Sequence, residues 1–127
     1  MIRNWKAQLV ALGAFAAAVA ARSSALAQHA GFDGSWSVQI ITEAGNCDRA
    51  YTYPTRIARG AISYDGEGPV ALSGRVTPGG VVHVTVSRGD QRAEGTGRLS
   101  RDSGSGTWKG RSPDKQCSGV WRAERRG

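Results

Sequence analysis

The sequence predicts an all-β protein, a small eight-stranded antiparallel up-and-down barrel with one disulfide bond. Three observations support this prediction. Apolar and polar residues alternate with a period of two after residue 30, and no helical periodicity is found there. Turn residues recur about every 8 to 12 positions, which is typical of an all-β barrel or sandwich. Glycine, with 18 of 127 residues, is about twice as frequent as usual, and the length suits a single domain.

Residues 1–27 are predicted to be a secretory signal peptide that does not belong to the fold. Arg3 and Lys6 give a positive start, an apolar run covers 9–21, and Ala25-Leu26-Ala27 fits a small-x-small cleavage pattern. The run is shorter than the roughly 20 residues that a membrane-spanning helix needs. Cleavage near Ala27 predicts a periplasmic or extracellular protein, with a flexible N-terminus over 28–33 and a barrel domain over 34–127. Since residues 1–27 hold three basic and no acidic residues, the net charge falls from +7 to +4.

Eight strands are expected in order, each with an apolar face on alternate positions and a turn after it. Pro54 predicts a bulge or an irregular stretch in the second strand, because proline cannot donate a ladder hydrogen bond. Glycines within strands relieve crowding in a tight barrel. The residues that share the apolar faces, strand by strand, are Trp36, Val38 and Ile40; Tyr51, Tyr53, Thr55 and Ile57; Ile62 and Tyr64; Val70, Leu72, Gly74 and Val76; Val82, Val84 and Val86; Ala93, Gly95, Gly97 and Leu99; Trp108; and Gly119, Trp121 and Ala123.

Cys47 and Cys117 are expected to form the disulfide bond. An exported chain with two cysteines most simply pairs them, and the sequence has no CxxC spacing or neighbouring histidine that would indicate a metal-binding or catalytic thiol. In an up-and-down barrel the first and last strands pair antiparallel. The end of the first strand, where Cys47 lies, is then beside the start of the last strand, where Cys117 lies. The bridge would join the barrel seam, although a sandwich could also bring the two cysteines together.

The polar faces of the last three strands predict a basic binding surface. A basic stripe attracts anionic polysaccharide, lipid headgroups or an acidic protein. A nucleic-acid partner is not expected, because the protein is predicted to be exported and no exposed aromatic residues are interleaved with the basic ones. This basic face consists of Arg92, Arg98, Lys109, Arg111 and Arg122.

The sequence favours no enzyme, metal centre or cofactor. His83 lies between Val82 and Val84, so the alternation places it on the outside, as a surface histidine. No Ser-His-acid order, paired carboxylates or phosphate-binding glycine motif is found, although an enzyme whose site is assembled across the sequence stays an alternative. Arg88-Gly89-Asp90 matches a cell-adhesion tripeptide, but Gly-Asp also suits a hairpin turn, which is our interpretation.

Three Gly-x-Trp sequences resemble a feature of known barrels. Gly34-Ser35-Trp36 opens the first strand, and Gly106-Thr107-Trp108 and Gly119-Val120-Trp121 repeat the spacing. A Gly-x-Trp in the first strand with a basic residue in the last resembles the lipocalin and calycin group and its small bacterial metalloprotease inhibitors, which carry one disulfide. This resemblance implies that Trp36 plugs the barrel floor and that Arg122 or Arg125 packs over it. Trp36, Trp108 and Trp121 are expected in the core, where together with three tyrosines they would fill much of the narrow interior.

A second resemblance covers the whole mature chain. The pattern from Asp33-Gly34-x-Trp36 through Cys47-Asp48-Arg49-Ala50-Tyr51 to Gly119-x-Trp121 resembles a family of small secreted alphaproteobacterial proteins. That family brings no established activity.

The expected function is that of an exported, non-enzymatic barrel that binds a partner at the cell envelope. The partner would be a protein or an anionic glycan or lipid, and the calycin resemblance favours inhibition of a hydrolase, either a protease or a lysozyme. The alternatives are a carrier of a small hydrophobic ligand and a glycan-binding or adhesive envelope protein. We expect a monomer without a cofactor or metal, whose mature form does not span a membrane.

Overall fold

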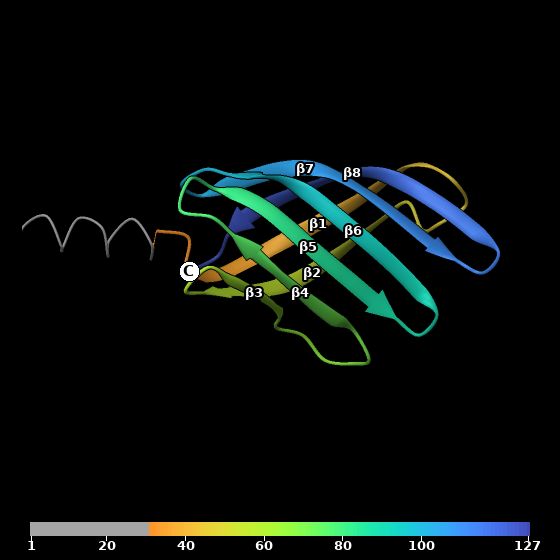
Figure 1. Cartoon of the computed structure of the whole chain (residues 1–127), viewed down its shortest axis with the longest axis horizontal. Helices are drawn as coiled ribbons and strands as arrows, with labels where there is room; N and C mark the ends of the chain where they lie inside the picture. The colour runs from red at the N-terminus through yellow and green to blue at the C-terminus, as the bar shows by residue number, and fades with distance from the viewer. Residues whose placement is uncertain (1–30) are drawn as a thin grey trace, which may run out of the picture.

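Alternating apolar and polar residues form eight antiparallel strands in the computed structural model, which describes residues 31–127 (Figure 1). Each strand pairs with the next, and β1 pairs with β8, so the predicted closed up-and-down barrel is confirmed. The predicted signal peptide and residues 28–30 lie outside the described part of the chain. The strands are β1 (Gly34–Ala44), β2 (Ala50–Ala58), β3 (Ala61–Tyr64), β4 (Ala71–Val76), β5 (Val81–Arg88), β6 (Gln91–Leu99), β7 (Ser103–Ser112) and β8 (Lys115–Arg125).

The barrel has two ends that differ in their loops. Figure 1 shows the C-terminus at one end and the tips of the β5–β6 and β7–β8 hairpins at the other. The β5–β6 turn consists of Gly89 and Asp90, and Gly89 has a φ of +61°, a left-handed conformation that glycine adopts without steric cost. The interpretation of the Arg-Gly-Asp tripeptide as a hairpin turn is therefore confirmed.

The seam between the first and last strands is held by backbone pairing and by the disulfide. β1 and β8 are paired from Trp36 opposite Arg125 to Ala44 opposite Ser118, with one register shift between Thr42 and Ala44. Cys47, just beyond β1, is bonded to Cys117 in β8, with 6.2 Å between the two Cα atoms. This is the pairing predicted from the up-and-down topology.

The bulge expected at Pro54 is not found. Pairing between β1 and β2 runs without a shift from Gly34 opposite Ile57 to Ile41 opposite Ala50, and Pro54 lies opposite Ser37 within it. On its other side β2 pairs with β3 only from Thr55 onward, so Pro54 lies just beyond that ladder. A proline is tolerated there because it does not have to donate a hydrogen bond to a second neighbouring strand.

The inward faces of the strands make a core that is concentrated toward the end holding the termini. Its apolar members come from all eight strands, β4 contributing only its last residue. All three predicted core tryptophans belong to it. The buried apolar residues are Trp36, Ile57, Ile62, Val76, Val82, Leu99, Trp108, Cys117, Trp121 and Ala123. Over residues 31–127, no helix is both long and apolar enough to cross a membrane.

Candidate functional site: the barrel cavity

The end of the barrel that holds the termini is closed by Trp36 and Arg125. The Trp36 ring is 2% exposed, and its Nε1 donates a hydrogen bond of 2.9 Å to the carbonyl oxygen of Phe32. The Arg125 guanidinium lies 4.7 Å from the centroid of the Trp36 ring, within the range of a cation–π interaction. Of the two arginines that the resemblance offered for this position, the structure uses Arg125, whereas Arg122 is exposed on the outer face.

Arg125 also ties the chain before β1 to the barrel. Its Nη1 donates to the carbonyl oxygen of Asp33 at 2.7 Å, and its Nη2 donates to those of Gly31 at 2.7 Å and Arg101 at 2.8 Å. Its Nε is 3.2 Å from a carboxylate oxygen of Asp102. Gly31–Asp33, the last part of the segment expected to be flexible, therefore contributes to the floor of the barrel.

Above this floor the barrel encloses a cavity of about 690 Å³. This volume lies within the range of about 300–1,000 Å³ that is typical of small-molecule sites. The cavity extends from Trp36 at the floor to Arg88 and Lys115 at the ends of strands on the opposite side, and all eight strands contribute to its wall. The aromatic side chains, which were expected to fill much of the interior, leave this volume open.

The cavity exists because the indoles lie along the wall and glycines make room for them. A Cβ atom built on Gly106 would be 2.6 Å from two atoms of the Trp121 indole, and one on Gly97 would be 2.5 Å from its Cζ2. The Trp121 Nε1 donates a hydrogen bond of 3.0 Å to the carbonyl oxygen of Thr96, which fixes the ring in this position. Trp121 thus packs on backbone of β6 and β7, and the space in front of it stays open.

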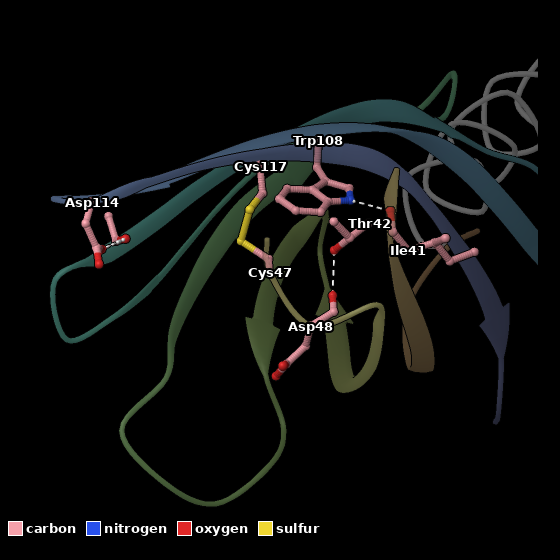
Figure 2. The surroundings of a disulfide bond; sticks show 8 residues. Ile41, Thr42, Cys47, Asp48, Trp108, Asp114 and Cys117 are labelled. Carbon is pink, nitrogen blue, oxygen red and sulfur yellow. Dashed lines mark hydrogen bonds between the residues drawn. A yellow bond between two sulfur atoms is a disulfide. The ribbon is translucent and has the colours of Figure 1, made fainter. Parts of the chain in front are cut away.

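Trp108 is held against the seam in the same way. Its Nε1 donates a hydrogen bond of 3.0 Å to the carbonyl oxygen of Ile41, next to the register shift in β1 (Figure 2). Figure 2 also shows the ring beside the Cys47–Cys117 bridge. The disulfide therefore fixes the wall of the cavity as well as the seam.

The opposite wall carries three tyrosines in edge-to-face contact. The ring centroids of Tyr51 and Tyr53 are 5.7 Å apart, and those of Tyr53 and Tyr64 are 6.1 Å apart. The Tyr64 hydroxyl donates to the carbonyl oxygen of Glu67 at 3.1 Å. No hydrogen bond to the hydroxyls of Tyr51 and Tyr53 is found within residues 31–127. These two hydroxyls are free to bind a polar group in the cavity.

Burial and nearby charges shift the pKa of these two hydroxyls. Burial is the main cause that raises the pKa of both tyrosines above its ordinary value of 10.0. The carboxylate of Asp48 raises the pKa of Tyr51 further, whereas the positive charge of Arg88 lowers the pKa of Tyr51 and of Tyr53.

The open end of the cavity, which we call the mouth, is lined by four basic residues and by three acidic ones, Asp48, Glu67 and Glu94. Basic residues come from the ends of four successive strands, β5 to β8, whereas Asp48 and Glu67 lie in the β1–β2 and β3–β4 loops on the other side. Glu94, on β6, lies directly opposite Lys109 in the sheet register. We call the basic group at this edge the mouth cations, and its members are Arg88, Arg92, Arg111 and Lys115.

Two of the mouth cations are directed inward by the strand alternation. Arg88 has the same parity as Val84 and Val86 on β5, and Lys115 has the same parity as the buried Cys117 on β8. Neither forms a salt bridge with any residue of the range 31–127. Sequence reasoning missed both as site residues, although the alternation already placed Arg88 on the apolar face of its strand.

The structure places all five residues of the predicted basic face on the outside, where they are exposed, but divides them into two groups. Near the mouth, Arg92 lies directly opposite Arg111, two residues along β7 from Lys109. Toward the other end, Arg98 and Arg122 flank Ser105, which lies opposite both. The Thr96–Thr107 row lies between the two groups, and Glu94 lies opposite Lys109 within the first group, so the stripe is not continuous.

Residues 31–127 hold no group of three or more His, Cys, Asp and Glu side chains arranged to bind a metal ion. His83 is exposed on the outer face of β5, opposite Arg75 and Thr96. A scan against protein-family models and searches of curated proteins and of solved structures found no match to this chain. The class of protein is therefore defined by its architecture: a disulfide-closed eight-stranded barrel with an internal cavity.

Proposed function

We propose that this protein is an exported binding protein that holds a small, largely apolar molecule inside its barrel. The observation that carries the proposal is the cavity of about 690 Å³. Drug-sized ligands are typically bound in concave, mainly apolar sites with a few polar groups that fix their orientation. The cavity combines tryptophan, valine and leucine walls with two free tyrosine hydroxyls and a charged mouth.

Export is supported by two features. Disulfides form and persist in oxidising compartments, and the Cys47–Cys117 bridge closes the barrel seam. The predicted signal peptide over residues 1–27 agrees with a periplasmic or extracellular location. Inhibition of a protease or lysozyme stays a prediction, which no structural observation favours over ligand binding. The division of the basic face into two groups gives less support to a glycan-binding surface.

Intrinsic fluorescence offers a direct test of the proposal. Trp36, Trp108 and Trp121 all line the cavity, and the fourth tryptophan, Trp5, lies in the predicted signal peptide. We expect the neutral dye N-phenyl-1-naphthylamine to bind the mature protein saturably, with a gain in dye emission and a loss of tryptophan emission by energy transfer. A flat titration in both signals would contradict the proposal.

A pair of variants distinguishes the cavity from the outer surface. Val86 lines the cavity one alternation below the mouth residue Arg88, whereas its neighbour Ser87 faces outward. Val86→Phe adds bulk to the cavity and is expected to weaken dye binding at least tenfold. Ser87→Phe adds a phenyl ring outside and should leave the affinity within about twofold. Equal effects of the two variants would place the dye elsewhere than in the cavity.

A further inference from the structure

The floor and the mouth of the cavity differ in the hydrogen-bond donors that they offer to a ligand. Deep in the barrel, the indole N–H groups of Trp36, Trp108 and Trp121 are all occupied by backbone carbonyl oxygens. The floor therefore presents apolar ring surface and no free donor from these three rings. Free donors lie toward the mouth, where Arg88 at the end of β5 and the hydroxyls of Tyr51 and Tyr53 line the cavity.

Arg88 is placed to act together with Tyr51 and Tyr53. It lies at the end of β5 with inward parity, it lines the cavity, and its charge acts on both tyrosine hydroxyls. A guanidinium carries five N–H donors in a fixed planar arrangement that matches a carboxylate or phosphate. A phenolic hydroxyl can add a further donor to the same group.

The charge around this point favours an anion. Lys115 is a second inward-directed cation at the mouth, and Arg92 lies directly opposite Arg111. Arg92 and Arg111 are exposed on the outer face, and Asp90 and Asp114 lie in the neighbouring turns, so Arg88 and Lys115 are the two mouth cations with inward parity. Asp48 and Glu67 lie in the loops across the mouth, and of these only Asp48 acts on a tyrosine, Tyr51.

We infer that the ligand is an anionic amphiphile, whose apolar body lies on the tryptophan floor and whose carboxylate or similar anionic head is bound at the mouth by Arg88 with Tyr51 and Tyr53. This inference rests on the proposed function and adds the charge and the orientation of the ligand. This anionic head group could belong to a free fatty acid or to an aromatic carboxylic acid. The shared chemistry is an anionic head on an apolar body.

The test compares three competitors with one hydrocarbon chain and different head groups. Dodecanoate, dodecan-1-ol and dodecyltrimethylammonium are titrated against N-phenyl-1-naphthylamine bound to the mature protein. We expect dodecanoate to compete at least fivefold better than the alcohol and the cation to compete worst. Charge-assisted hydrogen bonds are stronger than neutral ones but weaker when exposed, so we expect a fivefold to tenfold preference.

Variants locate the head group. Arg88→Gln is expected to remove the preference for dodecanoate over dodecanol, and Arg88→Lys to retain part of it. Arg122→Gln removes the same charge from the outer face toward the closed end and serves as the matched control, with the preference unchanged. Arg88 and Arg122 are both exposed, so neither substitution disturbs the core.

The two proposals fail in distinguishable ways. If neither the dye nor any dodecyl compound binds, the proposed function is wrong. If the dye binds but the alcohol or the cation competes as well as dodecanoate, or no dodecyl compound competes, only the anionic-ligand inference is overturned. A preference for dodecanoate that survives in Arg88→Gln would also overturn it, because the anion would then be bound elsewhere.

Discussion

Removal of the Cys47–Cys117 bridge should show how much of the barrel's stability depends on its seam. The bridge closes a loop of 70 residues. The chain-entropy relation for a loop of that length gives a loss of about 4 kcal/mol when the cross-link is removed. Domains of this kind have a total free energy of unfolding of about 5–15 kcal/mol. The bridge therefore accounts for a large part of the stability.

The suitable variant replaces both cysteines by alanine. Cys117 is only 5% exposed, so a serine hydroxyl there would be buried without an assured partner. With a slope of about 1.3 kcal/mol per molar urea, toward the low end of the usual range, a loss of about 4 kcal/mol lowers the unfolding midpoint by about 3 M. Urea titration followed by tryptophan fluorescence measures this shift.

Reduction supplies an independent comparison. The wild-type protein with dithiothreitol should unfold at nearly the same urea concentration as the Cys47→Ala/Cys117→Ala variant, and dithiothreitol should not affect the variant. If the midpoint falls by less than about 0.5 M at an unchanged slope, the reasoning is refuted, because the paired strands β1 and β8 would then hold the seam without the bridge.

Three further predictions concern the floor, the wall and the tyrosines of the cavity. Arg125→Gln should lower the free energy of unfolding by about 2–4 kcal/mol, because it removes the cation–π contact and several hydrogen bonds. In the same urea titration, the control Arg126→Gln, at an exposed position, should change the free energy of unfolding by less than about 0.5 kcal/mol. Gly106→Ala should destabilise by at least about 1–3 kcal/mol, because its Cβ would overlap the Thr96 carbonyl oxygen and the Trp121 ring. Gly79→Ala, which meets only one hydroxyl at 3.9 Å, should be nearly neutral; equal effects would contradict the close packing around Gly106. The raised pKa values of Tyr51 and Tyr53 mean that the folded chain holds these protons more tightly than the unfolded chain, so the associated stability is present below pH 10 and is lost as the pH rises through the folded values. Absorbance at 295 nm should show Tyr51 and Tyr53 ionising above pH 10, and Tyr53→Phe should remove one of these late steps. If Tyr53→Phe removes no step above pH 10, the burial of Tyr53 is contradicted.

The barrel itself could be predicted from the sequence because strand alternation is a local property. Each inward position could be assigned from its neighbours, and the up-and-down order then placed Cys47 beside Cys117. The same alternation distinguishes Arg125 from Arg122: Arg125 shares the parity of the buried Trp121 and Ala123, so it reaches the floor, whereas Arg122 points outward.

The cavity and the grouping of the charges could not be predicted in this way, because both depend on contacts between strands. Trp121 leaves the lumen open because Gly97 of β6 and Gly106 of β7 lie beneath its ring. Likewise, the period of two places Arg92 and Arg111 outside, but only the register between β6 and β7 brings them directly opposite one another. A single sequence does not specify the register between strands or the ring orientation.

The central claim, that a ligand lies inside the barrel, is tested most directly by the three indole N–H signals of the ¹⁵N-labelled mature protein. Trp36, Trp108 and Trp121 line the cavity and differ in depth and position around it. On titration with N-phenyl-1-naphthylamine, we predict saturable shifts of these indole signals with little change at outer-face amides such as those of Arg98 and Arg122. Shifts confined to the outer face, or unchanged indole signals at saturating dye, would contradict the claim.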